Sequence, residues 1–359
     1  MKIEVIGFFE SATGIGEAAR LCAQELAASG FKVRTVSLEK SFMKKSELDW
    51  TFENTLKNDE QANVRIYHIN PDRLSWAILK ETGHEKFLES YNMGYWAWEL
   101  SEIPNSWLDA LGFMNEILTP SGFSAAAIQK GDKSTRVTVI PHTVGDDLSS
   151  VPMRNQLKIP QDGFLVSTIF RPDSSLERKN PMALITAFLK AFTDQDNAWL
   201  VLKTRCKDDR DAYARIVELC AGRKNIKIID EVWTREQING LMKDSDIYAS
   251  LHRSEGYGLT LAEAKKFGTP VMATGWSGNT DFCTADDTIL VDYTLQPVRS
   301  THPAFKDMKQ SNWAEPDTNQ AADLLKKFYT DREGLDKYRN RGITGKASPL
   351  SDYLKSILL

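Results

Sequence analysis

Short apolar runs alternate with longer amphipathic segments along most of the chain. The first run, residues 3–9, predicts a buried strand, and residues 14–29 show the spacing of a helix that ends at Gly30. Residues 31–37 alternate between apolar and polar side chains, which is typical of a strand. A strand, a helix and a second strand in this order indicate a parallel, doubly wound sheet.

The same order continues through the first half after a polar stretch at 40–62, which we interpret as a surface excursion. A helix is predicted to begin at Pro71, and another to span residues 121–130. Further strands are predicted at 64–70, 116–120 and 136–140, and residues 91–99 form an aromatic-rich segment that ends near Pro104. Residues 146–161 contain serines and prolines without strong periodicity, so we interpret them as an interdomain linker.

A second α/β series follows this linker. Its strands are predicted at 164–170, 198–204, 225–229, 246–251, 270–274 and 288–291. Its helices are predicted at 181–192, 211–220, 234–243 and 259–267, and the sequence from Pro316 is helical in character. We therefore expect two domains, residues 1–150 and 151–335, and a helical tail, 336–359, that packs back toward the first domain.

The bulk composition fits this division. A chain of 359 residues is too long for one typical core, and 42% hydrophobic with 26% charged residues is ordinary for a globular protein. A net charge of −4 gives no global attraction to nucleic acid. Four scattered cysteines without a Cys-x-x-Cys pair, an N-terminus that begins directly as a strand and the lack of a long apolar run favour a cytoplasmic protein.

The stretch around Glu255 has the chemistry of a phosphate site. An apolar strand leads into the turn Gly256, Tyr257 and Gly258, and a helix begins at Leu259. Glycine lets a backbone approach a ligand closely, and the first N–H groups of a helix favour anions. Glu255 precedes the turn and Glu263 lies eight residues later, where a carboxylate could accept hydrogen bonds from a diol. The alternative is a glycine-rich loop before an amphipathic helix with two solvated glutamates.

The string from His252 to Phe282 closely resembles the Glu-x7-Glu signature of retaining family-4 glycosyltransferases with the GT-B fold. Residues 268–274 match the continuation of that signature, and a looser resemblance extends over most of the chain. The resemblance implies an α/β fold of two doubly wound, Rossmann-like domains facing a central cleft. It implies that Glu255 positions the sugar of a nucleotide diphosphate-sugar and that Glu263 binds its ribose.

Arg178 and Lys179 are candidates to stabilise the charge on the leaving diphosphate. The family usually shows Gly-Arg-x4-Lys here, and Lys179 resembles that lysine. Arg171 lies eight residues before Lys179 instead of five, so we rank Arg178 above Arg171. The alternative is a basic helix N-terminus in solvent, which is disfavoured because cations there need a partner.

Gly14 and Gly16 resemble the N-terminal glycine loop of the family, which approaches the donor phosphates. By itself such a turn also serves helix packing. Ala19 stands where a dinucleotide fingerprint would have a third glycine, and Glu39 is the one obvious acidic partner for a ribose, so we do not expect NAD.

Many family members place a histidine at the end of the strand that corresponds to 64–70, near the acceptor side of the donor sugar. That position falls on Asn70, with His68 two residues earlier on the same strand face. A structural role is the alternative for His68.

Two further groups are candidates for sugar contacts. Trp96, Trp98 and Glu99 could form an acceptor platform, or the two indoles could belong to the core. Ser277 and Asn279 could recognise hydroxyls of the donor sugar, or they could form a plain turn.

No cofactor and no essential metal are expected. Asp244 and Asp246 form an Asp-x-Asp pair, but they fall between a helix and a strand, where aspartates are common in turns. Three lysines within residues 40–45 could contact a membrane surface peripherally, at its inner face in the cytoplasm; the alternative is a solvated loop.

The resemblance implies a retaining, metal-independent hexosyltransferase that uses a UDP- or GDP-sugar. Its acceptor would be a hydroxyl of a glycan or a lipid-linked saccharide, as in polysaccharide biosynthesis. Two alternatives stay open: a GT-B nucleotide-sugar epimerase, and a non-catalytic subunit that binds a nucleotide-sugar. Nucleic acid is not an expected partner. The base, sugar, acceptor, linkage and oligomeric state do not follow from the sequence.

Overall fold

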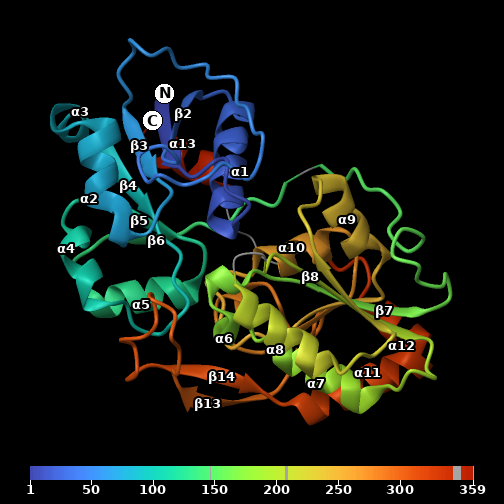
Figure 1. The fold of residues 1–359 in the computed structure, drawn as a ribbon. Coiled ribbons are helices and arrows are strands. Elements are labelled where there is room, and N and C mark those ends of the chain that lie inside the picture. Colours follow the sequence, from blue (N-terminus) through green and yellow to red (C-terminus); the bar gives the residue numbers. More distant parts are fainter. Residues whose placement is uncertain (146, 207–208, 343–348, 359) are drawn as a thin grey trace. The chain divides into compact units, whose positions relative to one another are not determined.

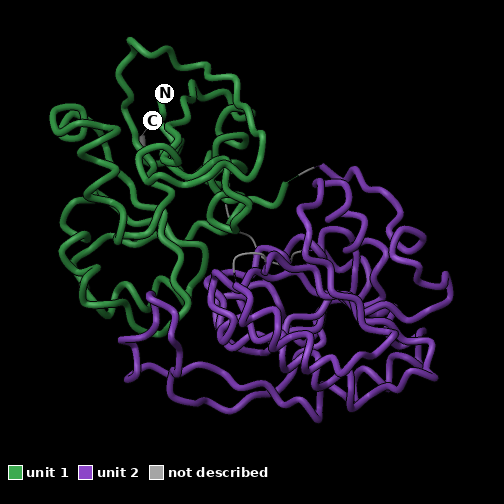
Figure 2. Tube along the Cα trace, viewed as in Figure 1, with its two compact units in different colours: residues 1–145, 346–359 green, residues 146–345 purple. Residues whose placement is uncertain are grey.

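The computed structural model describes residues 1–145, 147–206, 209–342 and 349–358. The chain forms two compact units (Figure 2): unit 1 contains residues 1–145 and 346–359, and unit 2 contains residues 146–345. The sequence analysis placed the domain boundary after residue 150 and the start of the tail at 336. In the structure the units divide after Gly145, and residues 336–342 belong to unit 2.

Unit 1 is built on a parallel sheet of six strands in the order β2-β1-β3-β4-β5-β6. The strands are β1 (Lys2–Gly7), β2 (Lys32–Ser37), β3 (Val64–Tyr67), β4 (Tyr91–Tyr95), β5 (Glu116–Thr119) and β6 (Val137–Val139). The helices are α1 (Gly14–Ala28), α2 (Leu74–Ala77), α3 (His84–Leu88), α4 (Leu108–Leu111), α5 (Gly122–Gly131) and α13 (Leu350–Leu358). The strand order reverses between β1 and β3, where doubly wound sheets bind ligands.

Unit 2 repeats this plan with the order β12-β11-β10-β7-β8-β9. The strands are β7 (Phe164–Ile169), β8 (Ala198–Thr204), β9 (Ile226–Asp230), β10 (Ile247–Ser250), β11 (Val271–Thr274) and β12 (Ile289–Val291). The helices are α6 (Leu176–Lys179), α7 (Pro181–Ala191), α8 (Arg210–Cys220), α9 (Arg235–Asp244), α10 (Leu259–Lys266), α11 (Thr318–Thr330) and α12 (Arg332–Asp336). Here the order reverses between β7 and β10. The predicted α/β fold with two doubly wound sheets is confirmed.

Side-chain alternation along the strands of unit 2 builds a core on each face of the sheet. Phe164 and Val166 on β7 pack toward α7, α8 and α11, whereas Leu165 between them packs on the opposite face toward α9. Figure 1 shows α7, α8 and α11 along one side of this sheet and α9 and α10 along the other. Burial on both faces explains why these strands are continuous apolar runs in the sequence.

The predicted linker is part of unit 2. Met153, Leu157 and Ile159 are buried against the α9 face of the sheet. The N–H of Val151 donates to the C=O of Glu236 on α9 at 3.2 Å. The linker interpretation of the described residues 147–161 is therefore wrong for most of their length. Three apolar side chains are enough to anchor this segment to unit 2, although its backbone is irregular.

One predicted element of unit 1 differs in form. The segment from Pro71 is a 3-10 turn (Pro71–Arg73), then α2, then a π-helical turn (Ile78–Thr82). The aromatic-rich segment 91–99, for which no strand was predicted, begins with β4, which ends at Tyr95.

A two-stranded antiparallel hairpin, β13 (Tyr293–Pro297) and β14 (Asn312–Pro316), extends unit 2 beyond its main sheet (Figure 1). All five residues of β13 are exposed. The sequence pattern assigned no element to this segment.

Candidate active site

The candidate residues of unit 2 gather where the strand order reverses. α6 follows β7, the turn 252–258 follows β10, and the turn 275–279 follows β11. Because these strands are parallel neighbours, their carboxyl ends and the segments after them lie at one edge of the sheet.

Glu255 is buried and forms ion pairs with two cations. Lys179 Nζ lies 2.6 Å from Glu255 Oε1, and Arg178 Nη1 lies 3.1 Å from Glu255 Oε2. The side chains of Glu255 and Arg178 are only 9% and 2% exposed. Burial opposes ionisation of Glu255, but the charges of Lys179 and Arg178 outweigh burial and lower the pKa of the carboxyl to about 2. The carboxylate is therefore charged at neutral pH.

Arg178 and Lys179 belong to the last turn of α6, not to the first turn of a helix as predicted. Asn180, in the left-handed conformation with φ of 48°, separates them from α7. Cations in the last turn of a helix are favoured by the helix dipole. Arg178 also donates to the C=O of Ser254 at 2.8 Å, which ties the segment after β7 to the turn after β10.

The turns after β10 and β11 are joined by hydrogen bonds. The N–H of Glu255 donates to Ser277 Oγ at 2.8 Å, and His252 Nε2 lies 3.0 Å from Asn279 Oδ1. Burial lowers the pKa of His252, so its imidazole is neutral at physiological pH. Ser277 has a φ of 77°, a strained backbone for serine that its surroundings hold in place. Ser277 and Asn279 are buried and support the backbone of Glu255, which favours the turn over the predicted contact with sugar hydroxyls.

The glycine turn before α10 has the geometry of an anion site. Gly258 caps α10 with a φ of 93°, and a Cβ at this position would lie 3.0 Å from Leu261 Cδ1. Gly256 and Tyr257 are buried in the same turn, and α10 begins at Leu259. Gly258 has no side chain to cap the first N–H groups of α10, so this helix end keeps the features that favour a phosphate.

Glu263 lies on α10, one helical turn beyond that anion site. Its side chain is 3% exposed and forms an ion pair with Arg235, the first residue of α9. The sequence analysis missed Arg235. The argument applied to Arg178, that a cation in the first turn of a helix needs a partner, would have indicated it.

Arg171 pairs with Asp173 in the segment after β7, with 2.6 Å between Nη2 and Oδ2.

Lys203 at the end of β8 is a second buried cation that was not predicted from the sequence. Its ammonium is buried and donates to the C=O of Glu231 at 2.7 Å, and burial lowers its pKa to about 8. A lysine inside a strand run is hard to recognise from sequence because it reads as one polar position in an apolar segment.

In unit 1 the two glycines of the N-terminal loop have different surroundings. A Cβ on Gly16 would lie 2.5 Å from the C=O oxygen of Ser11, so this glycine is needed for packing. A Cβ on Gly14 would meet no atom within 4 Å, so nothing in the described structure crowds the backbone there. Thr13 caps α1 by accepting a hydrogen bond from the N–H of Gly16.

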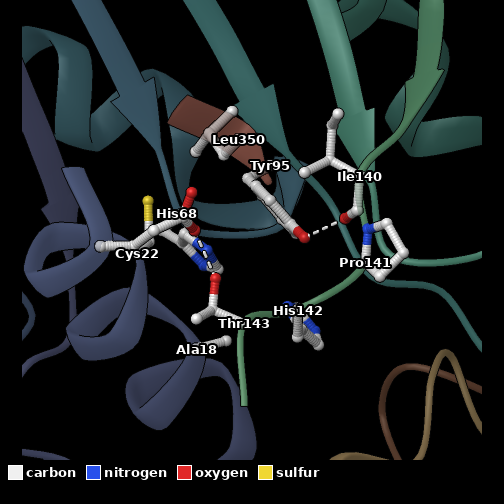
Figure 3. Close-up of a pocket in the computed structure, with 10 residues that line it drawn as sticks. Ala18, Cys22, His68, Tyr95, Ile140, Pro141, His142, Thr143 and Leu350 are labelled. Atoms are coloured by element: carbon white, nitrogen blue, oxygen red, sulfur yellow. Dashed lines mark hydrogen bonds between the residues drawn. The ribbon is translucent and has the colours of Figure 1, made fainter. Parts of the chain in front are cut away.

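His68 follows β3 and lies in a stack of three rings (Figure 3). Its ring centroid is 4.3 Å from that of Tyr95, which in turn stacks on His142 at 5.3 Å. Neither ring nitrogen of His68 has a hydrogen-bond partner among the described residues. Burial and the nearby His142 keep the pKa of His68 well below its usual range. The cavity beside the stack has room for about one water molecule.

Asn70 follows His68 and fixes the neighbouring strand end. Its Oδ1 accepts a hydrogen bond from the N–H of Ala97 at 3.2 Å.

The two predicted platform tryptophans are buried. Trp96 is 0% exposed and packs edge-on against Trp107, and Trp98 is 2% exposed with its Nε1 donating to the C=O of Glu102. Covered ring faces cannot stack on a sugar, so the structure corrects the platform in favour of core packing. Glu99, which follows Trp98 in the sequence, is half-buried.

The Asp-x-Asp pair is engaged in structural contacts. Asp244 accepts from the N–H of Met153 at 2.6 Å, and Asp246 forms ion pairs with Arg154 and Arg332 at 3.0 and 2.9 Å. Within the described residues, no group of three or more His, Cys, Asp and Glu side chains could hold a metal ion.

Two other sequence features can be located. In the 40–45 segment Phe42 packs against Phe8, while Met43 is 93% exposed. Among the helices that the structure describes, none has the length and apolar character needed to cross a bilayer. All four cysteines are buried and free.

Comparisons with known proteins place this geometry in context. Residues 166–296, which include every unit 2 candidate discussed above, match the family described as glycosyl transferases group 1. No curated protein sequence matches the chain.

Solved structures with low sequence identity share the fold. HepE from Anabaena, in complex with UDP and glucose, is 13% identical with a TM-score of 0.67, covering 99% of this chain and 98% of that chain. WaaG, a glycosyltransferase involved in lipopolysaccharide biosynthesis, is 14% identical with a TM-score of 0.64 and 99% coverage of both chains. Sucrose-phosphate synthase from Thermosynechococcus elongatus is 16% identical with a TM-score of 0.59, covering 93% and 95%. The chain therefore has the GT-B fold. The match of residues 166–296 to the family of glycosyl transferases supports a glycosyltransferase.

Proposed function

We propose that this protein is a retaining glycosyltransferase that moves a hexose from a UDP- or GDP-sugar to a hydroxyl of a glycan or a lipid-linked saccharide. We further propose that it needs no metal ion and belongs to the family-4, Glu-x7-Glu type. HepE, whose structure contains UDP and glucose, makes a UDP-hexose the first donor to test.

One observation carries the proposal: a buried carboxylate, Glu255, is clamped by Lys179 and Arg178 beside the glycine-capped end of α10. A diphosphate at that helix end would meet the N–H groups of α10 and the ammonium of Lys179. Glu255 lies within ion-pair distance of the same cations, where it could accept hydrogen bonds from the sugar. Oriented cations and dipoles that await developing negative charge are a main source of catalysis.

We propose the following roles, which the resemblance to retaining transferases implies. In the proposed reaction the acceptor hydroxyl attacks the anomeric carbon on the face from which the diphosphate leaves, and the bond from that carbon to the phosphate oxygen breaks. The leaving phosphate accepts the proton of the hydroxyl. Lys179 and Arg178 stabilise the diphosphate, Glu255 orients the sugar, and Glu263 binds the ribose diol.

The alternatives make different demands on the chain. An epimerase needs acid and base groups poised at the sugar, whereas His68 is 2% exposed beneath stacked rings. A non-catalytic subunit would bind the donor without turning it over.

A product analysis separates the three functions. A panel of UDP- and GDP-sugars is first ranked by thermal shift, since a ligand that binds the folded state raises the melting temperature. The tightest donor is then incubated with and without saccharide acceptors, and products are followed by NMR. We expect a new glycoside that keeps the anomeric configuration of the donor. An inverted first product would contradict the retaining mechanism, and a donor epimer without acceptor would favour the epimerase.

A further inference from the structure

We propose that the loop of the β13–β14 hairpin, residues 298–311, forms a second binding pocket that takes an anionic group of the acceptor, a phosphate or a carboxylate. The proposal rests on the transferase function above and concerns the acceptor, whose chemistry neither the sequence nor the comparisons define.

The pocket lies between this loop and α6. It is a depression open to solvent, with a volume of about 480 Å³. Its lining residues are Glu177, Val298, Arg299, Ser300, Thr301 and Lys309.

The loop is a cationic region on an acidic protein. The loop contains three basic residues, Arg299, Lys306 and Lys309, and one acidic residue, Asp307. The whole chain, in contrast, carries a net charge of −4. Arg299 and Lys309 reach the pocket, together with the hydroxyl of Thr301. A guanidinium, an ammonium and neutral hydroxyl donors are the groups that bind phosphate and carboxylate oxygens.

The remaining charged group of the pocket is Glu177, and its carboxylate is already engaged. Its Oε2 lies 3.1 Å from Ser175 Oγ and 3.3 Å from Ser300 Oγ, so it holds the loop to α6. One carboxylate against two cations leaves an excess of positive charge in the pocket.

The loop is anchored to the candidate active site. The ring of Phe305 lies 6.0 Å from the guanidinium carbon of Arg178, and His302 Nε2 lies 3.2 Å from the C=O oxygen of Asp173. Glu177 of the pocket is adjacent to Arg178 and Lys179 in α6.

A second anchor joins the hairpin to the turn that carries Glu255. Arg253 Nε donates to Glu315 Oε2 on β14 at 2.6 Å, and its Nη1 donates to the C=O of Glu177 at 2.6 Å. The N–H of Ala314 donates to the C=O of Arg253 at 2.9 Å. An anion bound to the hairpin would therefore be fixed relative to the cations that hold Glu255.

The pocket lining includes no residue that is assigned to the donor. The cations at Glu255 are Arg178 and Lys179, whereas the cations of the pocket are Arg299 and Lys309. The loop also lies beyond residues 166–296, the part of the chain that matches the transferase family. Such a position suits an element that selects the acceptor.

The test measures anion binding to protein whose donor site is already filled. The protein is saturated with UDP or GDP, whichever binds more tightly, and titrated with decyl phosphate or glucuronate by calorimetry. We expect at least one probe to bind, and the double variant Arg299→Gln/Lys309→Gln to weaken it about tenfold or more. The matched control is Lys306→Gln, which removes a positive charge from the same loop outside the pocket lining; we expect its affinity to stay within about twofold.

The outcomes are separable. Binding of decyl phosphate alone assigns the pocket to a lipid-linked phosphate, and binding of glucuronate alone assigns it to an acidic saccharide. Failure of both probes to bind, or equal affinity in the parent and the double variant, would overturn the proposal that this pocket binds an anion. If neither nucleotide binds, the proposed function fails, and the same titrations without nucleotide still compare the parent with the double variant.

Discussion

Glu255 is a charged side chain with almost no access to water, and two cations make this possible. Removing one partner of a buried ion pair typically costs about 3–5 kcal/mol, because the remaining charge is left without compensation. Arg178 is more buried than Lys179, whose side chain is 22% exposed. Lys179 is therefore the partner that can be removed with less damage to the fold, and the better probe of chemistry.

Lys179→Ala should lower turnover more than donor affinity, because charge on the diphosphate grows as the glycosidic bond breaks. The expected loss is ~3 kcal/mol, or about a hundredfold in kcat. Steady-state kinetics with the best donor measure it. Lys190→Ala on α7 is the matched control and should behave like the parent, because the Lys190 ammonium donates to the surface groups Thr318 and Asn319, away from the candidate site. A folded Lys179→Ala protein with parental kcat would refute this role.

Acid should weaken unit 2 through Glu255. The pKa of this carboxyl in the folded state, about 2, lies below its ordinary value of 4.5, so the stabilisation is fully present above pH 4.5 and is lost as the pH falls toward 2. The difference corresponds to about 3 kcal/mol. Urea unfolding of the parent and Glu255→Gln at pH 7, 5 and 3.5 tests this. The stability advantage of the parent should shrink at pH 3.5; an advantage that does not change with pH would contradict the assignment.

Glu263→Gln should raise the donor KM and change kcat little, because a ribose diol is bound equally in the ground and transition states. Loss of a charged hydrogen bond predicts an effect of roughly tenfold. Glu236→Gln, which alters a half-exposed carboxyl next to Arg235, is the control. An unchanged donor KM in Glu263→Gln would remove this residue from the ribose site.

At the scale of elements, the loops after β1, β7 and β10 carry most of the candidate residues. Each of these strands borders a reversal of strand order, where neighbouring loops diverge and leave room for a ligand. The glycines in these loops are not equivalent. Gly16 and Gly258 are required by packing or backbone conformation, whereas Gly14 is not.

Gly14 and Gly16 should therefore respond differently to alanine. Gly16→Ala places a methyl group against the Ser11 carbonyl and should destabilise unit 1 by about 1–3 kcal/mol. Gly14→Ala should leave the melting temperature nearly unchanged and weaken donor binding, if the donor phosphates approach this backbone. Thermal unfolding and donor titration distinguish the two effects. Parental donor affinity in Gly14→Ala would exclude the predicted contact.

Most strands of both sheets could be predicted from sequence because they are apolar or alternating runs bounded by turn residues. The hairpin could not: every residue of β13 is exposed, so no alternation of buried and exposed positions marks it. The linker was misjudged because Met153, Leu157 and Ile159 anchor a segment that has no regular structure.

The residues of the candidate site also include some that could be predicted from the sequence and some that could not. The motif spacing led to Glu255 and Lys179, which the structure brings into contact, although it placed the cations in the wrong helix. Spacing could not reveal Arg235, which meets Glu263 through tertiary packing. Aromatic content could not decide between a platform and a core for Trp96 and Trp98, because it does not tell which ring face is covered.

For the whole molecule, the proposed chemistry relies on side-chain cations and helix dipoles. The aspartates that most resemble a metal motif are held by arginines and backbone N–H groups.

Turnover should therefore survive chelation. With the best donor and acceptor, the rate in EDTA should stay within about twofold of the untreated rate, because the cations of Lys179 and Arg178 already compensate the leaving diphosphate. Protein passed through a chelating resin is the control for a tightly held ion. Complete loss of turnover, restored by one divalent ion, would overturn the metal-free proposal.

Because the chain returns to unit 1 after unit 2, unit 2 can complete its fold before unit 1 during translation. Unit 2 is continuous in sequence, so all its strands can pair as soon as they leave the ribosome. Unit 1 is not: Leu350 and Leu354 of α13 are buried in its core with Cys22 and Leu26 of α1. Until α13 emerges, the part of α1 that α13 covers faces water. A chain whose synthesis stops before α13 would therefore carry a folded unit 2 and an incomplete unit 1, and chaperones or proteases would recognise the exposed surface of α1.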